Sequence, residues 1–453
     1  MLTRLTLVTP LFLLIGCLSV KNDNKLYQLN MIADEGDYVT AYESARVTAQ
    51  ANAKTHHRLL WRLHEGYLAY WAGKPKASIQ AFTNGAEQLQ SYEDRASLNA
   101  RDLGSQLLSL MTEPGVKPYK GTVVDGILLH TYKGLAHALA GDRSSALAEL
   151  RQGAFRRKQA HEHFRRQLDR AAQKNHGLPG GWRALPEVKE AIEDAYGKDQ
   201  LLPHYLEFTN PLQVHLEAIF ATHQGSIQNR EHARKLWSTL LAMNPKQTLV
   251  QTYRAWAEAR HQNPNNDQPV IHLLHERGRA PELLSDAISL AIPINGRLTG
   301  IHLAFPDLVT HEDHLPALEA VASANISLKP IASLDSLIVA ERKTKDSKRL
   351  IEQMGAALTK AIAENQLAKE NDLLGLGLTL FNSSVNRADT RSWTTLPNQW
   401  EGALIESTTQ LHRLTMGSET FWVEVPDPQV SWLLHLKSVE GKSLTHQWIR
   451  LDP

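Results

Sequence analysis

The sequence predicts a multidomain α+β protein, in which an N-terminal α-helical solenoid is followed by a small antiparallel β-sandwich with inserted helices. Three observations predict this fold. A set of small and apolar residues recurs at a constant step in the first 260 residues, a polar segment follows at 261–269, and apolar residues beyond it alternate with polar ones. A chain of 453 residues is also too long for one compact core, which favours two or three domains.

Composition excludes some classes of protein. The chain has 49 basic and 48 acidic residues and a formal net charge of +1, whereas a dedicated nucleic-acid binder needs a basic excess to neutralise phosphates. Apolar residues make up 42%, which is typical of a folded chain. The single cysteine excludes an internal disulfide framework and a cysteine-based zinc site.

The N-terminal residues have the pattern of a signal peptide. Arg4 precedes an apolar run that ends at Ile15, roughly a dozen residues and too short to span a bilayer. The run leads into Leu14-Ile15-Gly16-Cys17, which resembles the lipobox of bacterial lipoproteins. This resemblance implies that residues 1–16 are removed, that Cys17 carries a diacylglycerol and a third acyl chain such as palmitate, and that residues 17–24 form a tether. A plain secretory signal with an incidental cysteine is the alternative.

The residue after the cysteine indicates a destination. Leu18 stands where an aspartate would signal retention in the inner membrane, so the sorting rule of lipoproteins implies the outer membrane and its periplasmic face. Each buried methylene contributes about 0.8 kcal/mol, so three acyl chains would serve as a nearly permanent membrane anchor.

Residues 25–260 are expected to form helix pairs. Five residues of one unit recur in a second unit 68 positions later, which is twice the 34-residue period of tetratricopeptide repeats. The two sets are Gly66, Gly73, Ser78, Phe82 and Gly85, and Gly134, Gly141, Ala146, Leu150 and Gly153. Small residues let two helices approach closely, and the second glycine of each set closes the turn between them. The pattern therefore predicts a tetratricopeptide-like helical repeat domain.

Two further segments match the repeat only in part, and two residues differ from the usual repeat pattern. Gly36-Asp37-Tyr38 with Ala41 resembles the turn, and Ala233, Trp237, Leu240 and Pro245 resemble the second helix and its terminating proline. Glu65 and Lys133 stand where the repeat usually has a leucine. An irregular helical bundle is the alternative.

A repeat array would offer a groove for a protein partner. Residues 151–174 contain eight basic side chains and two acidic ones, and their arginine pairs are the binding candidates Arg156, Arg157, Arg165 and Arg166. They could bind an acidic partner or the acidic head groups of the envelope. A solvated helix face explains the same charges.

Residues 270–453 are expected to form the β-sandwich, with a helical insertion at about 334–386. Alternating apolar residues predict four strands, centred on residues 288–292, 301–305, 421–425 and 432–436. Within the insertion, an apolar stripe at helical spacing covers residues 350–362, and a second helix is expected at about 372–386.

Three segments carry a resemblance to a family. They are Arg-Ala-Asp-Thr-Arg-Ser-Trp-Thr-Thr-Leu-Pro at 387–397, Glu-Arg-Gly-Arg-Ala-Pro at 276–281 and Tyr-Lys-Gly at 119–121. Together they resemble an uncharacterised family of bacterial outer-membrane lipoproteins with tetratricopeptide-like repeats. The resemblance implies an architecture and a location, and an association with small lipoproteins similar to activators of penicillin-binding proteins or to curli-type secretion components.

The tryptophan motif has two interpretations. Asp389, Arg391 and Trp393 could form a recognition patch, because tryptophan and arginine often dominate binding hot spots. Alternatively Asp389 and Arg391 pair with each other, and Trp393 wedges a helix against the sheet.

The sequence contains few motifs that indicate catalysis or metal binding. The chain has no HExxH, no phosphate-binding glycine loop, no Gly-x-Ser-x-Gly and no CxxC. Three histidine pairs could suggest a metal: His161/His163, His272/His275 and His311/His314. None has the i, i+4 spacing that aims two histidines at one ion on a helix. We therefore predict no catalytic residue, no metal site and no cofactor.

The sequence thus favours a lipid-anchored periplasmic scaffold or adaptor that binds protein partners in cell-envelope biogenesis, for example in peptidoglycan-synthase regulation or a secretion assembly. The first alternative is a module of the β-domain that binds peptidoglycan, another glycan or lipid. The second is a metal-dependent hydrolase. No nucleic-acid partner is expected.

Overall fold

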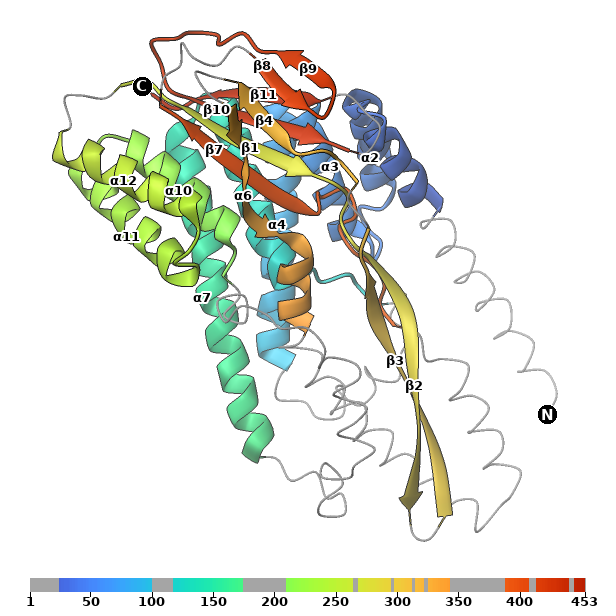
Figure 1. The fold of residues 1–453 in the computed structure, drawn as a ribbon. Helices are drawn as coiled ribbons and strands as arrows, with labels where there is room; N and C mark the ends of the chain where they lie inside the picture. Colours follow the sequence, from blue (N-terminus) through green and yellow to red (C-terminus); the bar gives the residue numbers. More distant parts are fainter. Residues whose placement is uncertain are drawn as a thin grey trace.

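The computed structural model shows a mixed α+β protein, with most helices in the first half of the chain and the strands in the second (Figure 1). It describes residues 24–99, 117–173, 209–263, 268–294, 297–311, 314–321, 325–342, 388–406, 413–439 and 444–452. Cys17 and the helices expected at 350–362 and 372–386 lie outside these ranges. Arg165 and Arg166 lie on a described helix, Arg143–Gln173, but their side chains are not described.

Helices that follow one another in the chain pack side by side. Residues 24–34 are helical, as are residues 334–342 between strands. The other helices are α2 (Tyr38–Ala51), α3 (Arg58–Trp71), α4 (Pro75–Asn99), α6 (Val123–Leu139), α7 (Arg143–Gln173), α10 (Pro211–His223), α11 (Ile227–Met243) and α12 (Thr248–Gln262). α3 packs on α4, α6 on α7 and α10 on α11. No helix in the described ranges is both long and apolar enough to cross a bilayer.

The recurring small residues lie at turns and helix crossings. Gly73 and Gly141 have φ angles of 68° and 85°, in the left-handed region that favours glycine, and each follows the first helix of its pair. A Cβ atom added at Gly66 would lie 2.7 Å from the ring of Phe82, and one at Gly134 would lie 3.0 Å from the Ala146 carbonyl oxygen. The residues that repeat therefore set how closely the paired helices approach.

A five-stranded sheet has the order β11 (Thr445–Arg450), β10 (Trp432–Ser438), β1 (Ile271–Arg277), β7 (Gln399–Ile405) and β6 (Lys329–Ser333). The expectation of antiparallel pairing is wrong for its centre, because β1 and β10 are parallel. Every residue of β1 is buried, since both faces of this strand are covered. Such burial on two sides is typical of parallel strands, which a long connection joins.

A second sheet packs on the first. It is antiparallel and has the order β5 (Asn325–Ser327), β4 (Leu318–Val321), β8 (Arg413–Met416) and β9 (Glu419–Trp422). Leu318 and Leu414 of this sheet share one apolar cluster with Ile271 and Leu434 of the five-stranded sheet. The strand expected at 421–425 ends at Trp422, although Val423 and Val425 still pack against this cluster.

Two long strands form a separate ribbon. β2 (Glu282–Ile294) and β3 (Arg297–Val309) pair antiparallel over 13 residues each. Figure 1 shows this yellow ribbon extending well beyond the two sheets. These strands contain the alternating residues that predicted strands at 288–292 and 301–305.

The helices cover the remaining face of the five-stranded sheet. One apolar cluster includes Tyr67 of α3, Phe220 of α10, Trp400 of β7 and Ile449 of β11. The helical and sheet-forming halves of the chain therefore share a core. The sheet occupies a helix face that would otherwise be open to a partner.

Replacement of Gly66 by alanine tests this packing. Gly66→Ala should lower the free energy of unfolding by about 1–3 kcal/mol, because the new methyl group overlaps the Phe82 ring. Gly126→Ala is the matched control, since the nearest atom to its Cβ lies at 3.5 Å and the change should be neutral or stabilising by about 0.5–1 kcal/mol. Urea unfolding measures both. Equal effects of the two changes would contradict the assigned crossing.

Candidate functional site

The two predicted arginines with described side chains are both engaged in hydrogen bonds, and Arg157 is half-buried. Arg156 of α7 is buried, and its Nε donates to His130 Nε2 at 2.9 Å while Nη1 donates to Glu93 at 2.7 Å. Arg157 Nη1 donates to the Thr209 hydroxyl at 3.0 Å. These guanidinium groups join α7 to neighbouring segments and do not form an open basic surface.

The tryptophan motif lies between the helices and the sheet. Arg391 donates from Nε and Nη2 to the two oxygens of Asp389 at 2.7 Å each, and its guanidinium lies over the ring of Tyr119 at 5.5 Å. Trp393 is only 3% exposed, and its ring centroid lies 6.0 Å from Phe82 and 6.2 Å from Tyr67. Trp393 therefore fills the space above the crossing of α3 and α4.

A buried carboxylate lies close to Trp393. Strand register places Glu276 of β1 opposite Lys437 of β10 on one side and opposite Trp400 of β7 on the other. Lys437 Nζ lies 3.4 Å from Glu276 Oε2, and His435 Nε2 lies 3.0 Å from Oε1. The side chains of Glu276 and His435 have no exposed surface. The sheet therefore presents an ion cluster to the helices.

Helices α3 and α6 supply hydroxyl groups to this cluster. Tyr67 of α3 donates to Glu276 Oε2, and Tyr132 of α6 donates to Oε1 at 2.6 Å. Lys437 Nζ donates to the Tyr67 hydroxyl at 2.6 Å, and Trp400 Nε1 donates to the Tyr132 hydroxyl at 3.1 Å. We call these five residues, Glu276, Lys437, Tyr67, Tyr132 and Trp400, the Glu276 cluster.

The cluster keeps its carboxylate ionised. Burial alone raises the pKa of the Glu276 carboxyl, but the Lys437 ammonium, His435 and the Tyr132 hydroxyl outweigh it and hold the pKa at about 2. Burial, followed by the charge of Glu276, raises the pKa of the Tyr67 hydroxyl well above its ordinary value. Tyr67 therefore stays protonated and can donate. The arrangement stabilises a buried ion pair between Glu276 and Lys437, and both side chains are closed to solvent.

A second buried network lies between α10, α12 and β1. His223 Nε2 and His272 Nε2 lie 2.9 Å apart, so one ring donates a proton to the other. His223 Nδ1 also lies 2.8 Å from Asp452, and the hydroxyl of Tyr253 lies 3.1 Å from His272 Nδ1. Burial, with the neighbouring His223, lowers the pKa of His272 well below its usual value. The neutral His272 ring and its partners connect the helices to β1 and to the last described residues.

The other histidines predicted as possible ligands are dispersed. His272 and His275 lie on opposite faces of β1, where His275 Nε2 lies 2.7 Å from the Ser438 hydroxyl oxygen. His161 is exposed on α7, and His311 lies 3.8 Å from Glu282. Among the residues with described coordinates, no three histidine, cysteine or acidic side chains are placed to hold a metal ion.

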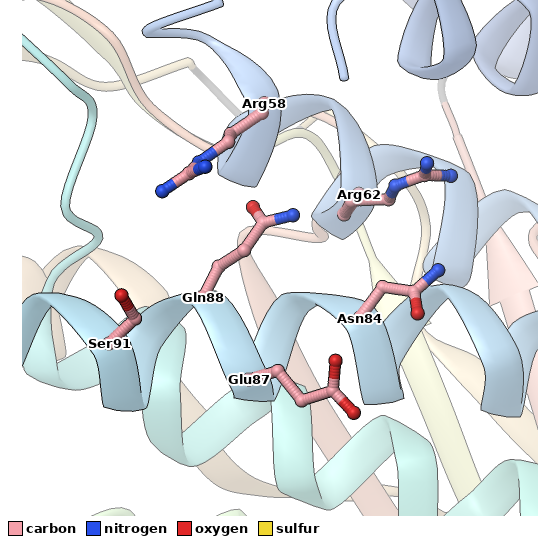
Figure 2. Close-up of a pocket in the computed structure, with 6 residues that line it drawn as sticks. All are labelled: Arg58, Arg62, Asn84, Glu87, Gln88 and Ser91. Atoms are coloured by element: carbon pink, nitrogen blue, oxygen red, sulfur yellow. The ribbon is translucent and has the colours of Figure 1, made fainter. Parts of the chain in front are cut away.

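A surface pocket of about 260 Å³ lies between α3 and α4. Arg58 and Arg62 line it from α3, and Asn84, Glu87, Gln88 and Ser91 line it from α4 (Figure 2). The arginines already have partners, since Arg58 donates to the Tyr92 hydroxyl at 3.0 Å and Arg62 to Glu65 at 2.5 Å. This lining has no base placed beside a nucleophile, and we assign no chemistry to it.

Sequence reasoning did not find the Glu276 cluster. The sequence does contain a sign of this cluster. The segment Ile-His-Leu-Leu-His-Glu-Arg at 271–277 has polar residues within an apolar strand, and the strand is buried on both faces. Trp-Leu-Leu-His-Leu-Lys-Ser at 432–438 has the same character. Polar residues that recur within a buried strand predict internal partners, although they do not say which ones.

Comparison with known proteins gives no relative. No family model matches the chain, and neither a curated protein nor a solved structure matches it. The resemblance to repeat-containing lipoproteins therefore stays a prediction, and function has to be argued from the geometry.

Removal of Lys437 tests the Glu276 cluster. Lys437→Met leaves a buried carboxylate without its counter-ion and should lower the free energy of unfolding by about 3–5 kcal/mol. The double variant Glu276→Gln/Lys437→Met should recover most of this loss, because neither side chain is then charged. Urea unfolding at neutral pH measures both, with Lys158→Met on exposed α7 as the control. A single variant as stable as the parent would contradict the assignment.

Acid should destabilise the protein through its buried histidines. Burial lowers the pKa of His64 from 6.5 to about 3, so below pH 6.5 the unfolded chain binds a proton that the folded chain does not. The stability that His64 contributes is complete above pH 6.5 and is lost as the pH falls toward 3. His64→Gln should flatten the decline of unfolding free energy between these values. His161→Gln, at an exposed position, should leave the slope unchanged, and an equal effect of both would refute the explanation.

Proposed function

We propose that this protein is a lipid-anchored periplasmic scaffold that binds a protein partner of the cell envelope. The projecting β2–β3 ribbon is the observation that carries the proposal. The ribbon is a two-stranded sheet of its own, so within the described chain each strand has hydrogen-bonding partners on one side only. Isolated two-stranded ribbons are marginally stable, and their open edges accept a further strand.

The base of the ribbon has exposed apolar side chains. Leu284 is 52% exposed and Val309 is 39% exposed. The register pairs Glu282 with Val309 and Leu284 with Asp307, so both apolar residues lie on one face of the ribbon. A partner strand that added to either edge would pair with the backbone groups there, and its own apolar side chains would pack beside Leu284 and Val309 on this face.

The helices and the two facing sheets could form a rigid support for the ribbon. The Glu276 cluster joins α3 and α6 to β1 and β10 through buried hydrogen bonds, which fixes the sheet on the helices. The paired helices and their turn glycines favour a degenerate tetratricopeptide-like solenoid, and the two facing sheets favour a β-sandwich. Because the five-stranded sheet already covers part of the helical surface, we propose the ribbon as the partner site.

The lipobox-like Leu14-Ile15-Gly16-Cys17 supports the anchor. Asn24, the first described helical residue, follows Cys17 by seven positions, and an extended segment of this length spans about 25 Å. The folded body would therefore stay close to the lipid surface, with the ribbon available to an envelope partner.

Site-specific photo-crosslinking in living cells tests the proposal. A photoreactive residue at position 284 or 309 should capture one reproducible protein, because both positions lie on the exposed base of the ribbon. Capture should fail when residues 288–303 are replaced by a two-residue turn, and should weaken in Cys17→Ser, which also releases the protein from the membrane fraction. A crosslinker at Ile227, 75% exposed on α11, is the matched control. The same product at position 227, or capture that survives the shortened ribbon, would refute the ribbon as partner site.

A further inference from the structure

The four-stranded sheet has a polar outer face. Its inner residues, such as Leu318 and Leu414, are buried against the five-stranded sheet, so alternate residues point away from the core. The register aligns one such row across all four strands. From β5 to β9 the row consists of Ser327, Glu319, Thr415 and Thr420. Strand spacing makes this row about 14 Å wide.

A second row on the same face contains an exposed indole. Arg413 of β8 is opposite Trp422 of β9, and its guanidinium lies 6.0 Å from the ring centroid. Trp422 is 77% exposed, the highest value among the large apolar side chains described. Arg413 packs on the indole and restricts its orientation. The ring is therefore a flat apolar surface, held beside a row of polar groups.

The polar row can both donate hydrogen bonds to hydroxyl groups and accept hydrogen bonds from them. Ser327, Thr415 and Thr420 each offer a donor and an acceptor, and Glu319 offers two acceptors. The Ser327 hydroxyl donates to Glu319 Oε1 at 3.1 Å, which orients the carboxylate. Sugars need this combination, because a pyranose ring has one apolar face of C–H groups and a rim of hydroxyl groups. The apolar face packs on an indole while the rim makes hydrogen bonds.

Other ligand classes fit this face less well. The centre of a protein interface is usually apolar. In these two rows the large apolar residues are Trp422 and Val321, and the other side chains are polar or charged. A nucleic acid needs excess positive charge, whereas the charges of Arg413 and Glu319 cancel. Addition of a peptide strand at β9 is limited by its length of four residues and by Pro426, which follows closely.

From these observations we propose that the outer face of the four-stranded sheet binds a polysaccharide, with one pyranose ring stacked on Trp422 and neighbouring sugars along the polar row. This site is separate from the β2–β3 ribbon. It goes beyond the scaffold function and does not depend on it.

Co-sedimentation of the purified full-length protein with insoluble polysaccharides tests the site. The probes are protein-free peptidoglycan sacculi, chitin and cellulose. The parent protein should sediment with at least one of them, and Trp422→Ala should bind about tenfold more weakly, as expected for loss of a central aromatic contact. Thr420→Val should weaken binding as well. Binding to sacculi and chitin only would assign the source as an N-acetylglucosamine polymer, whereas binding to cellulose too would assign a general pyranose surface.

Controls separate this site from misfolding and from the ribbon. Ile227→Ala, which removes an equally exposed apolar side chain from α11, should bind like the parent. Thermal unfolding of Trp422→Ala should match the parent because the indole is exposed, and its crosslinks from position 284 should persist. The proposal is overturned if the parent binds none of the three probes or if Trp422→Ala binds undiminished. It is also overturned if free stem peptides, and not free glycan strands, compete for binding to sacculi.

Discussion

Burial of a single carboxylate, that of Glu276, constrains the whole fold. A buried charge is tolerated only when a counter-ion and hydrogen-bond donors surround it. Its partners come from distant parts of the chain: Tyr67 is 209 residues away, Tyr132 is 144 and Lys437 is 161. The Glu276 carboxylate has all of its partners only when α3 and α6 are correctly placed and β1 pairs with β10 in the correct register. The cluster therefore favours one arrangement of helices and sheet over others of similar apolar burial.

The same packing determines which faces of the five-stranded sheet are buried. One face of the five-stranded sheet is committed to the helices, and the other is committed to the four-stranded sheet through an apolar cluster. The two binding sites proposed above lie on elements outside these contacts. The β2–β3 ribbon and the outer face with Trp422 differ in chemistry. The ribbon has strand edges with no partner among the described residues, and the sheet has an indole beside hydroxyl groups.

The sequence predicted what depends on local pattern. Gly73 and Gly141 marked turns because only glycine adopts their φ angles easily, and alternation found the long strands of the ribbon. Pairing across the chain was not predictable. The parallel partner of β1 and the carboxylate partners of Lys437 and Tyr67 depend on tertiary contacts that no local period records. Trp393 illustrates the limit, since its motif suited a binding patch as well as the buried wedge that the structure describes.

The parallel pairing of β1 with β10 has a consequence for the order of folding. During synthesis, β1 emerges well before Lys437, which follows Glu276 by 161 residues. Until β10 arrives, an apolar strand remains open along one edge, and Glu276 has no lysine beside it. Closing so large a loop is slow, and an unpaired strand in the meantime is prone to aggregation. The nascent chain should therefore need a holding chaperone until its final strands emerge, and truncation before β10 should yield material that is degraded rather than a smaller functional domain.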